Sequence, residues 1–515
     1  MAGVTLIAAT IFGILVAIVC VKFLYKIWWW PKMMEKKLKK QGIHGHPYKF
    51  LFGNLIEMMR MSKEAKSKPL SLTHDIMPWL NPFLQHLANN HRKIFVMWAG
   101  PTPRITVTDP KLIRELLNKH QEFHKPEANA FIEMFVTGLA GYNGEKWATH
   151  RKIVTPAFHI EKIKRMFSSA FGACVEEMII RWEELVSKTE TCELDVEREF
   201  MFLGGDVISR AAFGSNIEEG RSIFLLQKEQ CELILASPFT LFFPWLRFLP
   251  TASNRKARDN YKKVRGMIRG IIKKREDAER SGITMEDNDD ILGLLLKSRN
   301  EEKNKSKAGL TTDDVIEECK EFYLAGQDTT SALLTWTLVA LSMHPEWQDK
   351  ARKEVLRVIG KNKPKFDDLN QLRIMTMIFQ EVLRLYPALL LYRSTSKSCK
   401  LGDMTIPAGV QVFVPTHLVH RDCEVWGNNA LLFNPERFSE GVSKAAGKEH
   451  QLYIPFGWGA RMCIGLNFGM LEAKLALSRI LQLFWFELSP SYTHAPHCTL
   501  ILKPQYGAHI ILHKL

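Results

Sequence analysis

The sequence predicts a mostly helical fold with a small β portion and one N-terminal membrane-spanning helix. Helical periodicity dominates residues 145–385, short alternating runs flank that region on both sides, and an uncharged apolar stretch opens the chain. Of the 515 residues, 46% are hydrophobic and 24% are charged, close to the averages of globular proteins. We therefore expect a sizeable core and exclude global disorder.

The first segment has the features of a membrane anchor. Residues 4–21 carry no charge, and as a helix they would be about 27 Å long, near the thickness of the bilayer hydrocarbon. Trp28–Trp30 and a run of lysines follow, a pattern that places tryptophan at the headgroups and favours the cytosolic side for the rest of the chain. A cleaved signal peptide is the alternative, but its basic residues would precede the apolar run.

The expected layout is an anchor at residues 1–26, a basic linker at 27–50 and one folded domain at 51–515. The formal net charge is +15, which fits an anionic membrane surface or an acidic protein partner. Nucleic acid is not expected, because basic-aromatic interleaving and zinc-ligand spacing are both missing from the sequence. The nine cysteines are scattered without a C-x-x-C pair, which argues against a disulfide framework and a structural zinc site.

Local signals predict the main elements. Asp109-Pro110 begins a helix, and Thr311 or Thr312 caps a longer one that ends near His344 and spans roughly 48 Å. The charged patch at 275–310 is expected to be a solvated loop. The other predicted elements are a hairpin (Ile94–Ala99 and Arg104–Thr108), two strands (Thr395–Cys399 and Val410–Val414) and an apolar helix (Ile464–Leu483).

The most specific motif lies at residues 456–465, which read F-x-x-G-x-R-x-C-x-G. A cysteine just before a helix has its thiolate stabilised by the helix N-terminus. Gly459 and Gly465 allow the backbone to approach another group closely. For Cys463 alone, a buried structural thiol is the alternative. The whole pattern resembles the haem-binding loop of the cytochrome P-450 family.

This resemblance implies a fold with a long central helix and haem b between that helix and the thiolate helix. It makes Cys463 the iron ligand, pairs Arg461 with a haem propionate and lets Phe456 shield the sulfur from water. A thiolate ligand pushes electron density onto iron and favours O–O cleavage.

A second motif, Ala325-Gly326-Gln327-Asp328-Thr329, lies in the middle of the long helix. Glycine and threonine are poor residues for a helix interior, and Thr329 can bond back to the carbonyl of Ala325 and open a groove. A kinked core helix is the alternative. The segment resembles the family's (A/G)-G-x-(D/E)-T element, which places Ala325 and Gly326 at the cofactor and makes Asp328 and Thr329 a proton relay.

Three weaker patterns also resemble motifs of the family and occur in the same order along the chain. Glu381 and Arg384 share a helix face (i, i+3), and such a pair alone usually lies on the protein surface. The resemblance instead implies that both residues join Arg437 of the P-E-R-F motif in a buried network that supports the thiolate loop. Trp147 and Arg151 (i, i+4), together with Arg393, resemble propionate partners, with a solvated arginine as the alternative. His417 and His420 are interpreted as structural.

The details resemble the plant clan that includes secologanin synthase, as in Trp245-x-Arg247-Phe248-Leu249-Pro250 and Pro156-Ala157-Phe158-His159. Ala460 and Ala388 depart from the usual pattern where proline is common. The clan implies a monooxygenase of the endoplasmic reticulum membrane, facing the cytosol, that inserts one atom of dioxygen into a C–H bond of a hydrophobic small molecule. The expected substrates are terpenoids of the triterpene, iridoid or gibberellin type.

Electrons would come from a membrane-bound NADPH-cytochrome reductase, since the sequence has no flavin or nicotinamide fingerprint. Lys152, Lys162, Lys164 and Arg165 are candidate docking charges, with a solvated basic face as the alternative. A reductase-independent isomerase or dehydratase of hydroperoxides and a non-catalytic haem sensor are the competing functions. By family analogy the substrate pocket is lined by Phe131–Phe135, Pro238–Pro250 and Ala388–Leu391.

Overall fold

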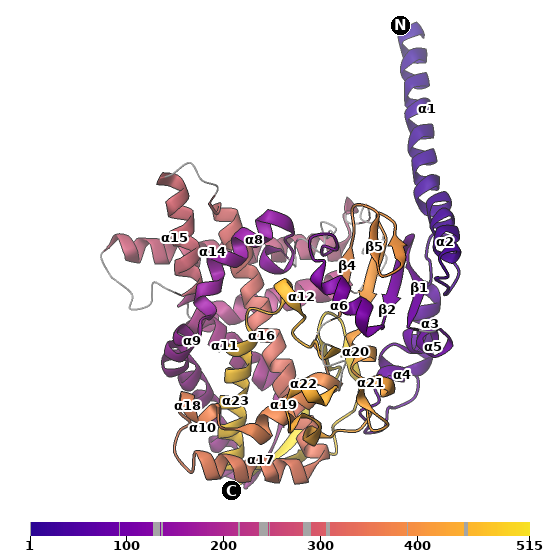
Figure 1. Cartoon of the computed structure of the whole chain (residues 1–515). Helices are drawn as coiled ribbons and strands as arrows, with labels where there is room; N and C mark the ends of the chain where they lie inside the picture. Colours follow the sequence, from indigo (N-terminus) through magenta and orange to yellow (C-terminus); the bar gives the residue numbers. More distant parts are fainter. Residues whose placement is uncertain are drawn as a thin grey trace. The chain divides into compact units, whose positions relative to one another are not determined.

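The computed structural model describes residues 2–91, 93–126, 134, 137–214, 217–235, 246, 248–281, 290–304, 309–388, 390–446 and 452–515. The chain divides into two compact units. The first comprises Met1–Lys68, Met77–Pro126 and Leu390–Val419, and the second comprises Pro69–Ile76, Glu127–Leu389 and His420–Leu515. Helices dominate and the strands are few and short, so the predicted fold class is confirmed (Figure 1).

The first unit begins with an almost continuous helical segment: α1 (Ala2–Leu24), a π-helical turn (Tyr25–Trp29) and α2 (Trp30–Lys40). The stretch Gly3–Lys40 is long and apolar enough to cross a membrane, and its most apolar window is fully exposed. α2 is amphipathic, because Met34 and Leu38 are buried while most of its lysines are exposed. The buried Glu35 pairs with Lys32 and Lys39, at 3.0 Å each. Much of the expected basic linker is therefore helical.

A mixed four-stranded sheet forms the centre of the first unit, in the order β1 (Ile94–Ala99), β2 (Thr102–Val107), β7 (Gln411–Val414) and β4 (Leu391–Ser394). β1 and β2 form the predicted antiparallel hairpin, β7 pairs parallel with β2, and β4 pairs antiparallel with β7. Its side chains pack with α5 (Pro82–Asn90) in one core cluster. The remaining elements are α3 (Leu55–Ala65), α4 (Met77–Leu80), α6 (Pro110–Asn118), β5 (Cys399–Leu401), β6 (Met404–Ile406) and α20 (Thr416–Val419).

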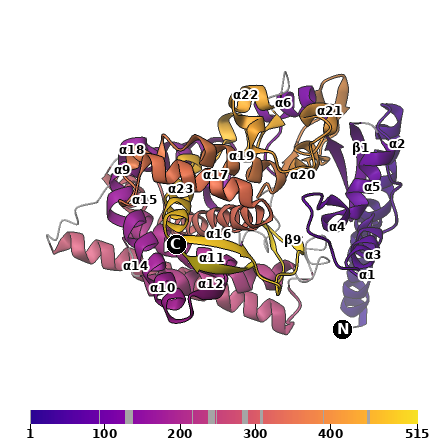
Figure 2. The same cartoon turned by 90° about the horizontal axis from the view of Figure 1, so that it is seen from below.

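The second unit is built around α16 (Thr312–Met343), which packs on α11 (Val196–Phe213), α19 (Arg373–Leu385) and α23 (Leu466–Leu483) (Figure 2). Thr311 caps α16 and forms a capping box with Asp314, as its sequence predicts. Most residues of α16 are buried, so it forms the core of this unit.

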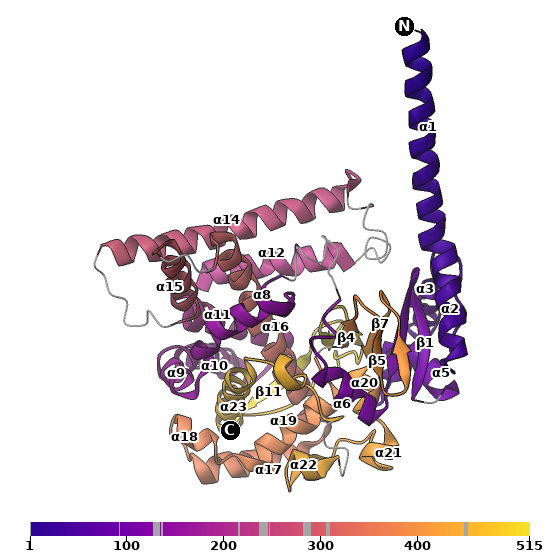
Figure 3. The same cartoon turned by 45° about the horizontal axis from the view of Figure 1, so that its top comes forward.

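Helices and short sheets surround α16. α12 (Ile217–Leu235) and α14 (Ala252–Arg280) lie side by side in Figure 3. The other helices are α8 (Gly144–Val154), α9 (Ile160–Met166), α10 (Gly172–Thr189), α15 (Ile291–Asn304), α17 (Pro345–Val358), α18 (Phe366–Leu369), α21 (Cys423–Trp426) and α22 (Val442–Ala445). β3 (Thr191–Asp195), β11 (His509–Lys514) and β8 (Phe484–Leu488) form one sheet, and β9 (Pro496–Cys498) pairs with β10 (Leu502–Pro504).

Two predictions of local structure are wrong. The charged patch expected to be a loop contains the end of α14 and all of α15. Ile291 and Leu292 are buried there, and Arg275 pairs with Asp290 at 2.8 Å inside the protein. The expected strand Thr395–Cys399 does not form. β4 ends at Ser394, residues 395–398 make a bend in which the Thr395 hydroxyl donates to the carbonyl of Lys397, and β5 begins at Cys399.

Candidate active site

The loop before α23 presents Cys463 on an exposed surface. Its shape depends on Gly457 and Gly459, which have φ values of 73° and 68°, in the left-handed region that favours glycine. The backbone N–H of Cys463 donates to the carbonyl of Phe456 at 2.9 Å and closes the loop. A Cβ at Gly465 would lie 3.9 Å from the Cys463 sulfur, so the chain turns closely around the thiol.

Arg461 joins this loop to α8. Its guanidinium donates to the carbonyl of Tyr142 at 2.8 Å and to Oδ1 of Asn143 at 3.1 Å. The same group lies over the ring of Trp147, 3.9 Å from the ring centroid, a cation–π contact. Arg461 and Trp147, two of the predicted cofactor residues, are therefore in contact.

Arg151 lies one turn after Trp147 on α8, close enough to Cys463 for their charges to interact. Burial lowers the pKa of the Arg151 guanidinium, and the neighbouring Cys463 thiolate partly offsets that decrease. The site therefore places guanidinium groups and a thiol together.

The middle of α16 contributes small residues to the candidate site. Ala325 is exposed although Tyr323, Leu324 and Gln327 beside it are buried, so this turn of the helix has an open face. The Thr329 hydroxyl donates to the Ala325 carbonyl at 2.7 Å. α16 continues as one α-helix through this bond, so the expected opening of the helix does not break it.

Gly326 faces α11 instead of the open side of α16. A Cβ at this position would lie 2.7 Å from Cδ1 of Ile208, too close for any larger residue without rearrangement. Close packing of α16 on α11 therefore explains this glycine, a reason that the motif did not reveal.

The side chains of Asp328 and Thr329 make polar contacts with different partners. The Asp328 carboxylate forms an ion pair with Lys503 of β10, and Glu197 of α11 lies 3.5 Å from the same ammonium group. The sequence analysis did not find Lys503 or Glu197. They lie more than 100 residues from Asp328 in the chain, and no local pattern connects them.

The residues Glu381, Arg384 and Arg437 come together in the second unit. Glu381 and Arg384 are completely buried and form two parallel hydrogen bonds of 2.7 Å, while Arg437 lies 3.7 Å from Glu381. The backbone N–H of Asn434 also donates to Glu381, at 2.9 Å. Arg384 uses its remaining donors on the backbone carbonyls of His420, Ala430 and Leu432.

His420 connects this network to the thiolate loop. Its carbonyl accepts from Arg384, and its ring Nε2 accepts from the backbone N–H of Ile454 at 3.1 Å. The carbonyl of Ile454 in turn accepts from Gly457, where the loop begins to turn. A continuous chain of hydrogen bonds therefore runs from Glu381 to the loop that carries Cys463.

Comparison with known proteins identifies the family. The family model described as Cytochrome P450 matches residues 73–511. The chain is 50% identical to Cytochrome P450 CYP72A616 of Paris polyphylla and 48% identical to Cytochrome P450 CYP72A219 of Panax ginseng, with 95% of each chain covered. It is 44% identical to Secologanin synthase 1 of Catharanthus roseus, over 99% of this chain and 98% of the relative.

The chain belongs to the cytochrome P450 family. The predicted resemblance is confirmed, and with it a haem-thiolate monooxygenase that uses haem b, dioxygen, a redox partner and a small-molecule substrate. The exposed apolar helix α1 makes this P450 a membrane-anchored enzyme.

The described residues fit a haem. One sulfur is enough for an iron whose equatorial positions are filled by a porphyrin, and Cys463 is exposed at the start of α23. Arg151 and Arg461 supply positive charge for propionates, and the exposed Ala325 leaves room on α16. Arg393 lies in the first unit, on β4, where burial lowers its pKa to about 10.

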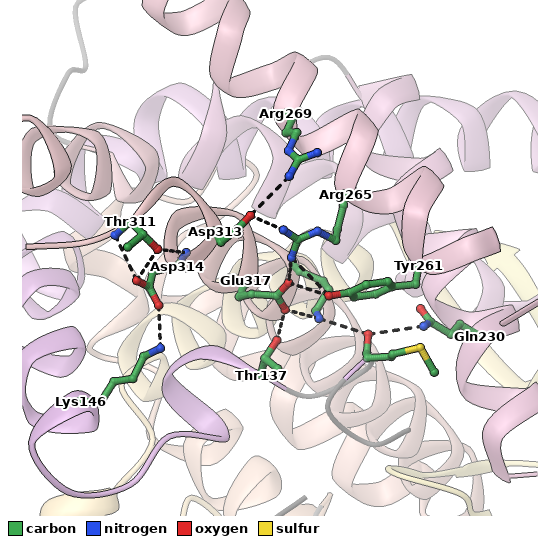
Figure 4. Close-up of polar contacts among 12 residues, drawn as sticks. Thr137, Lys146, Gln230, Tyr261, Arg265, Arg269, Thr311, Asp313, Asp314 and Glu317 are labelled. Carbon is green, nitrogen blue, oxygen red and sulfur yellow. Dashed lines mark hydrogen bonds and ion pairs between the residues drawn. The ribbon is translucent and has the colours of Figure 1, made fainter. Parts of the chain in front are cut away.

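The acidic start of α16 holds α8 and the segment before it (Figure 4). Asp314 pairs with Lys146 at 2.7 Å, and Glu317 pairs with Arg265 and accepts from the hydroxyl of Thr137. Glu318 lies 2.6 Å from Nδ1 of the buried His150. This role of the acids depends on the fold around them, so the sequence alone does not reveal it.

Most of the expected pocket lining lies outside the described residues. This is so for 131–133, 135, 238–245, 247 and 389. The structure describes Met134, Leu246, Phe248–Pro250, Ala388 and Leu390–Leu391 of those segments.

Proposed function

We propose that this P450 inserts one oxygen atom of dioxygen into a C–H bond of a hydrophobic terpenoid, with electrons from a membrane-bound NADPH-cytochrome reductase. Similarity to Secologanin synthase 1 over almost the whole chain supports a terpenoid, of the iridoid, triterpene or gibberellin type. The single observation that carries the reaction type is the exposed Cys463 thiol at the start of α23, next to Arg151 and Arg461.

The loop residues would bind and orient the cofactor. Cys463 would hold the iron through its sulfur, and the bound haem would supply a thiolate-ligated iron that activates dioxygen. Gly459 and Gly465 would let the backbone approach the macrocycle, and Phe456 would keep water from the sulfur. Arg461, together with Trp147 and Arg151, would hold the propionates through charge-assisted hydrogen bonds.

Asp328 and Thr329 of α16 would deliver protons for the reaction. Thr329 Oγ1 holds a proton that it shares with the carbonyl of Ala325, which keeps the hydroxyl oriented. The Asp328 carboxylate would take a proton from water and replace the one that Thr329 gives up.

The network of Glu381, Arg384 and Arg437 would have a supporting role. Its hydrogen bonds to the backbone reach the thiolate loop through His420, so it would fix the position of Cys463 without touching the substrate.

We further propose that residues 1–26 anchor the enzyme in the endoplasmic reticulum membrane, that 27–50 form a basic linker and that 51–515 form the catalytic domain in the cytosol. The exposed apolar surface of α1, followed by Trp28 and the exposed lysines of α2, supports this orientation.

Lysines on α8 and α9 would dock the reductase. Lys152 and Lys164 are exposed, and they lie on the same pair of helices as Arg165 and Lys162. An acidic partner would bind there by charge complementarity, so we expect docking to weaken as salt is added.

The proposal is tested by the carbon monoxide difference spectrum of reduced membranes that contain the full chain. We expect a long-wavelength Soret band that is lost in Cys463→Ala and retained in Cys423→Ala, a matched control because Cys423 is also exposed. A band that persists in Cys463→Ala would refute the assigned ligand. Terpenoid oxidation should then require reductase and NADPH, whereas turnover of hydroperoxides without reductase would favour the isomerase or dehydratase.

A further inference from the structure

Lys503 brings a buried positive charge to the middle of α16. Its ammonium group is paired with the Asp328 carboxylate and lies 3.5 Å from Glu197. The side chains of Lys503 and Asp328 are each 16% exposed, and that of Glu197 is 14% exposed. Three elements that are far apart in sequence, β10, α16 and α11, therefore meet at one charge cluster.

The cluster keeps Lys503 charged. Burial by itself would lower the pKa of the Lys503 ammonium, but Asp328 and Glu197 outweigh burial and raise that pKa above its ordinary value. Cys231 of α12 also lies near these charges. Burial first, and then Asp328, raise the pKa of its thiol to about 12, so that it stays neutral. One ammonium group thus serves two carboxylates.

This arrangement determines where the Asp328 carboxylate is held. The carboxylate binds Lys503, while the Thr329 hydroxyl next to it in sequence donates to the Ala325 carbonyl. To pass a proton toward Thr329, Asp328 must loosen its contact with the ammonium group. Glu197 is close enough to accept the ammonium group when that happens, so the positive charge need not lose its partners.

We propose that Lys503 is a positioning residue for proton delivery, which holds the Asp328 carboxylate and releases it by exchange toward Glu197. This inference rests on the proposed function of Asp328 and Thr329 as a proton relay. It assigns no chemical step to Lys503 itself, because its ammonium group pairs with the carboxylates of Asp328 and Glu197.

A set of four variants tests the inference in the full-length enzyme with reductase. Lys503→Met removes the charge, Lys503→Arg keeps it, and Glu197→Gln leaves Asp328 as the only carboxylate for Lys503. Lys320→Met is the matched control, because Lys320 forms another buried ion pair, with Glu317, on the same helix.

The readouts are the share of NADPH electrons that reach product instead of hydrogen peroxide and the solvent isotope effect on product formation. We expect Lys503→Met to form product about tenfold more slowly and to raise the isotope effect roughly twofold. Lys503→Arg should restore both to within about threefold of the wild type, and Glu197→Gln should slow product formation about threefold. Lys320→Met should leave the isotope effect unchanged.

Thermal unfolding of Lys503→Met, Asp328→Asn and the double variant gives a readout that does not depend on turnover. Residues in contact show non-additive changes, so we expect the double variant to melt above the temperature that additive single changes would give. Additive changes in melting temperature would overturn the inference. It would also be overturned if Lys503→Met and Glu197→Gln both kept the wild-type share of NADPH electrons in product and the wild-type isotope effect. If the wild type lacked the carbon monoxide band or reductase-dependent product, the proposed function would fail instead.

Discussion

The acids Glu381 and Asp328 lie in two regions of the second unit that use ion pairs differently. Glu381 is completely buried, and every guanidinium nitrogen of its partner Arg384 donates to a carboxylate or a backbone carbonyl. Asp328 is partly exposed, and its partner Lys503 is shared with a second carboxylate. A fully bonded pair fixes one geometry, whereas a shared ammonium group allows exchange. The comparison suggests that the first region supports the fold and that the second serves the reaction.

Breaking the first region should give the largest loss of stability. Arg384→Met leaves the Glu381 carboxylate buried without its main partner, which costs about 3–5 kcal/mol. We expect a large drop in melting temperature and loss of the carbon monoxide band, measured on the same membranes. Lys350→Met is the control, since its pair with Glu436 is exposed and should change stability by less than about 1 kcal/mol. A stable Arg384→Met variant with a normal band would contradict the supporting role.

The buried acid Glu472 sharpens the comparison, because no cationic side chain pairs with it in the described part of the chain. It is fully buried on α23, and within the part of the chain that the structure describes no ion pair includes it. Burial raises the pKa of its carboxyl well above 4.5, with a small opposing contribution from Thr330. Above pH 4.5 the unfolded chain loses this proton while the folded chain keeps it, so the acid costs stability as pH rises.

Glu472→Gln removes that ionisation. We expect the variant to gain stability at pH 7.5 and to gain much less at pH 5. Melting temperatures at the two pH values provide the test. An equal gain at both values, or a loss that grows with pH, would show that the Glu472 carboxyl is ionised in the folded protein.

The smallest effect on stability is expected in the second region. Thr329→Ala removes a hydrogen bond but introduces a better helix former, so the net change should stay within about 1 kcal/mol. Product formation should nevertheless fall while peroxide rises, as measured by both yields per NADPH. Thr337→Ala loses the same kind of bond, to Leu333 at 2.7 Å, and should keep normal product formation. Equal peroxide yields from the two variants would refute a special role for Thr329.

Local signals predicted much of the fold. The hairpin formed by β1 and β2 and the cap at Asp109 depend on neighbouring residues, and the structure contains both. Residues 291–296 were misread because the charges around them hid a short apolar stretch that is buried only through tertiary packing.

The site was predictable to the extent that its chemistry is local. The loop that ends at Cys463 is one contiguous motif, so its residue types identify it. Its contacts to the carbonyl of Tyr142 and to Asn143 were not predictable. Every residue type has a backbone carbonyl, so the use of that carbonyl as an acceptor cannot be recognised from the sequence. Lys503 was missed for a related reason, since one lysine among many reveals its partner only when β10 reaches α16.

The bond between Arg461 and Tyr142 also bears on how the enzyme is made. About 310 residues separate Arg151 from Cys463 in the sequence, so the thiolate loop is synthesised well after α8. At about 5–20 residues per second, a ribosome needs roughly 15–60 s to bridge that interval. During that time α8 has left the ribosome without the loop that completes its site, while α1 is already available to the membrane. The complete set of haem-binding residues is therefore present only after the thiolate loop has been synthesised.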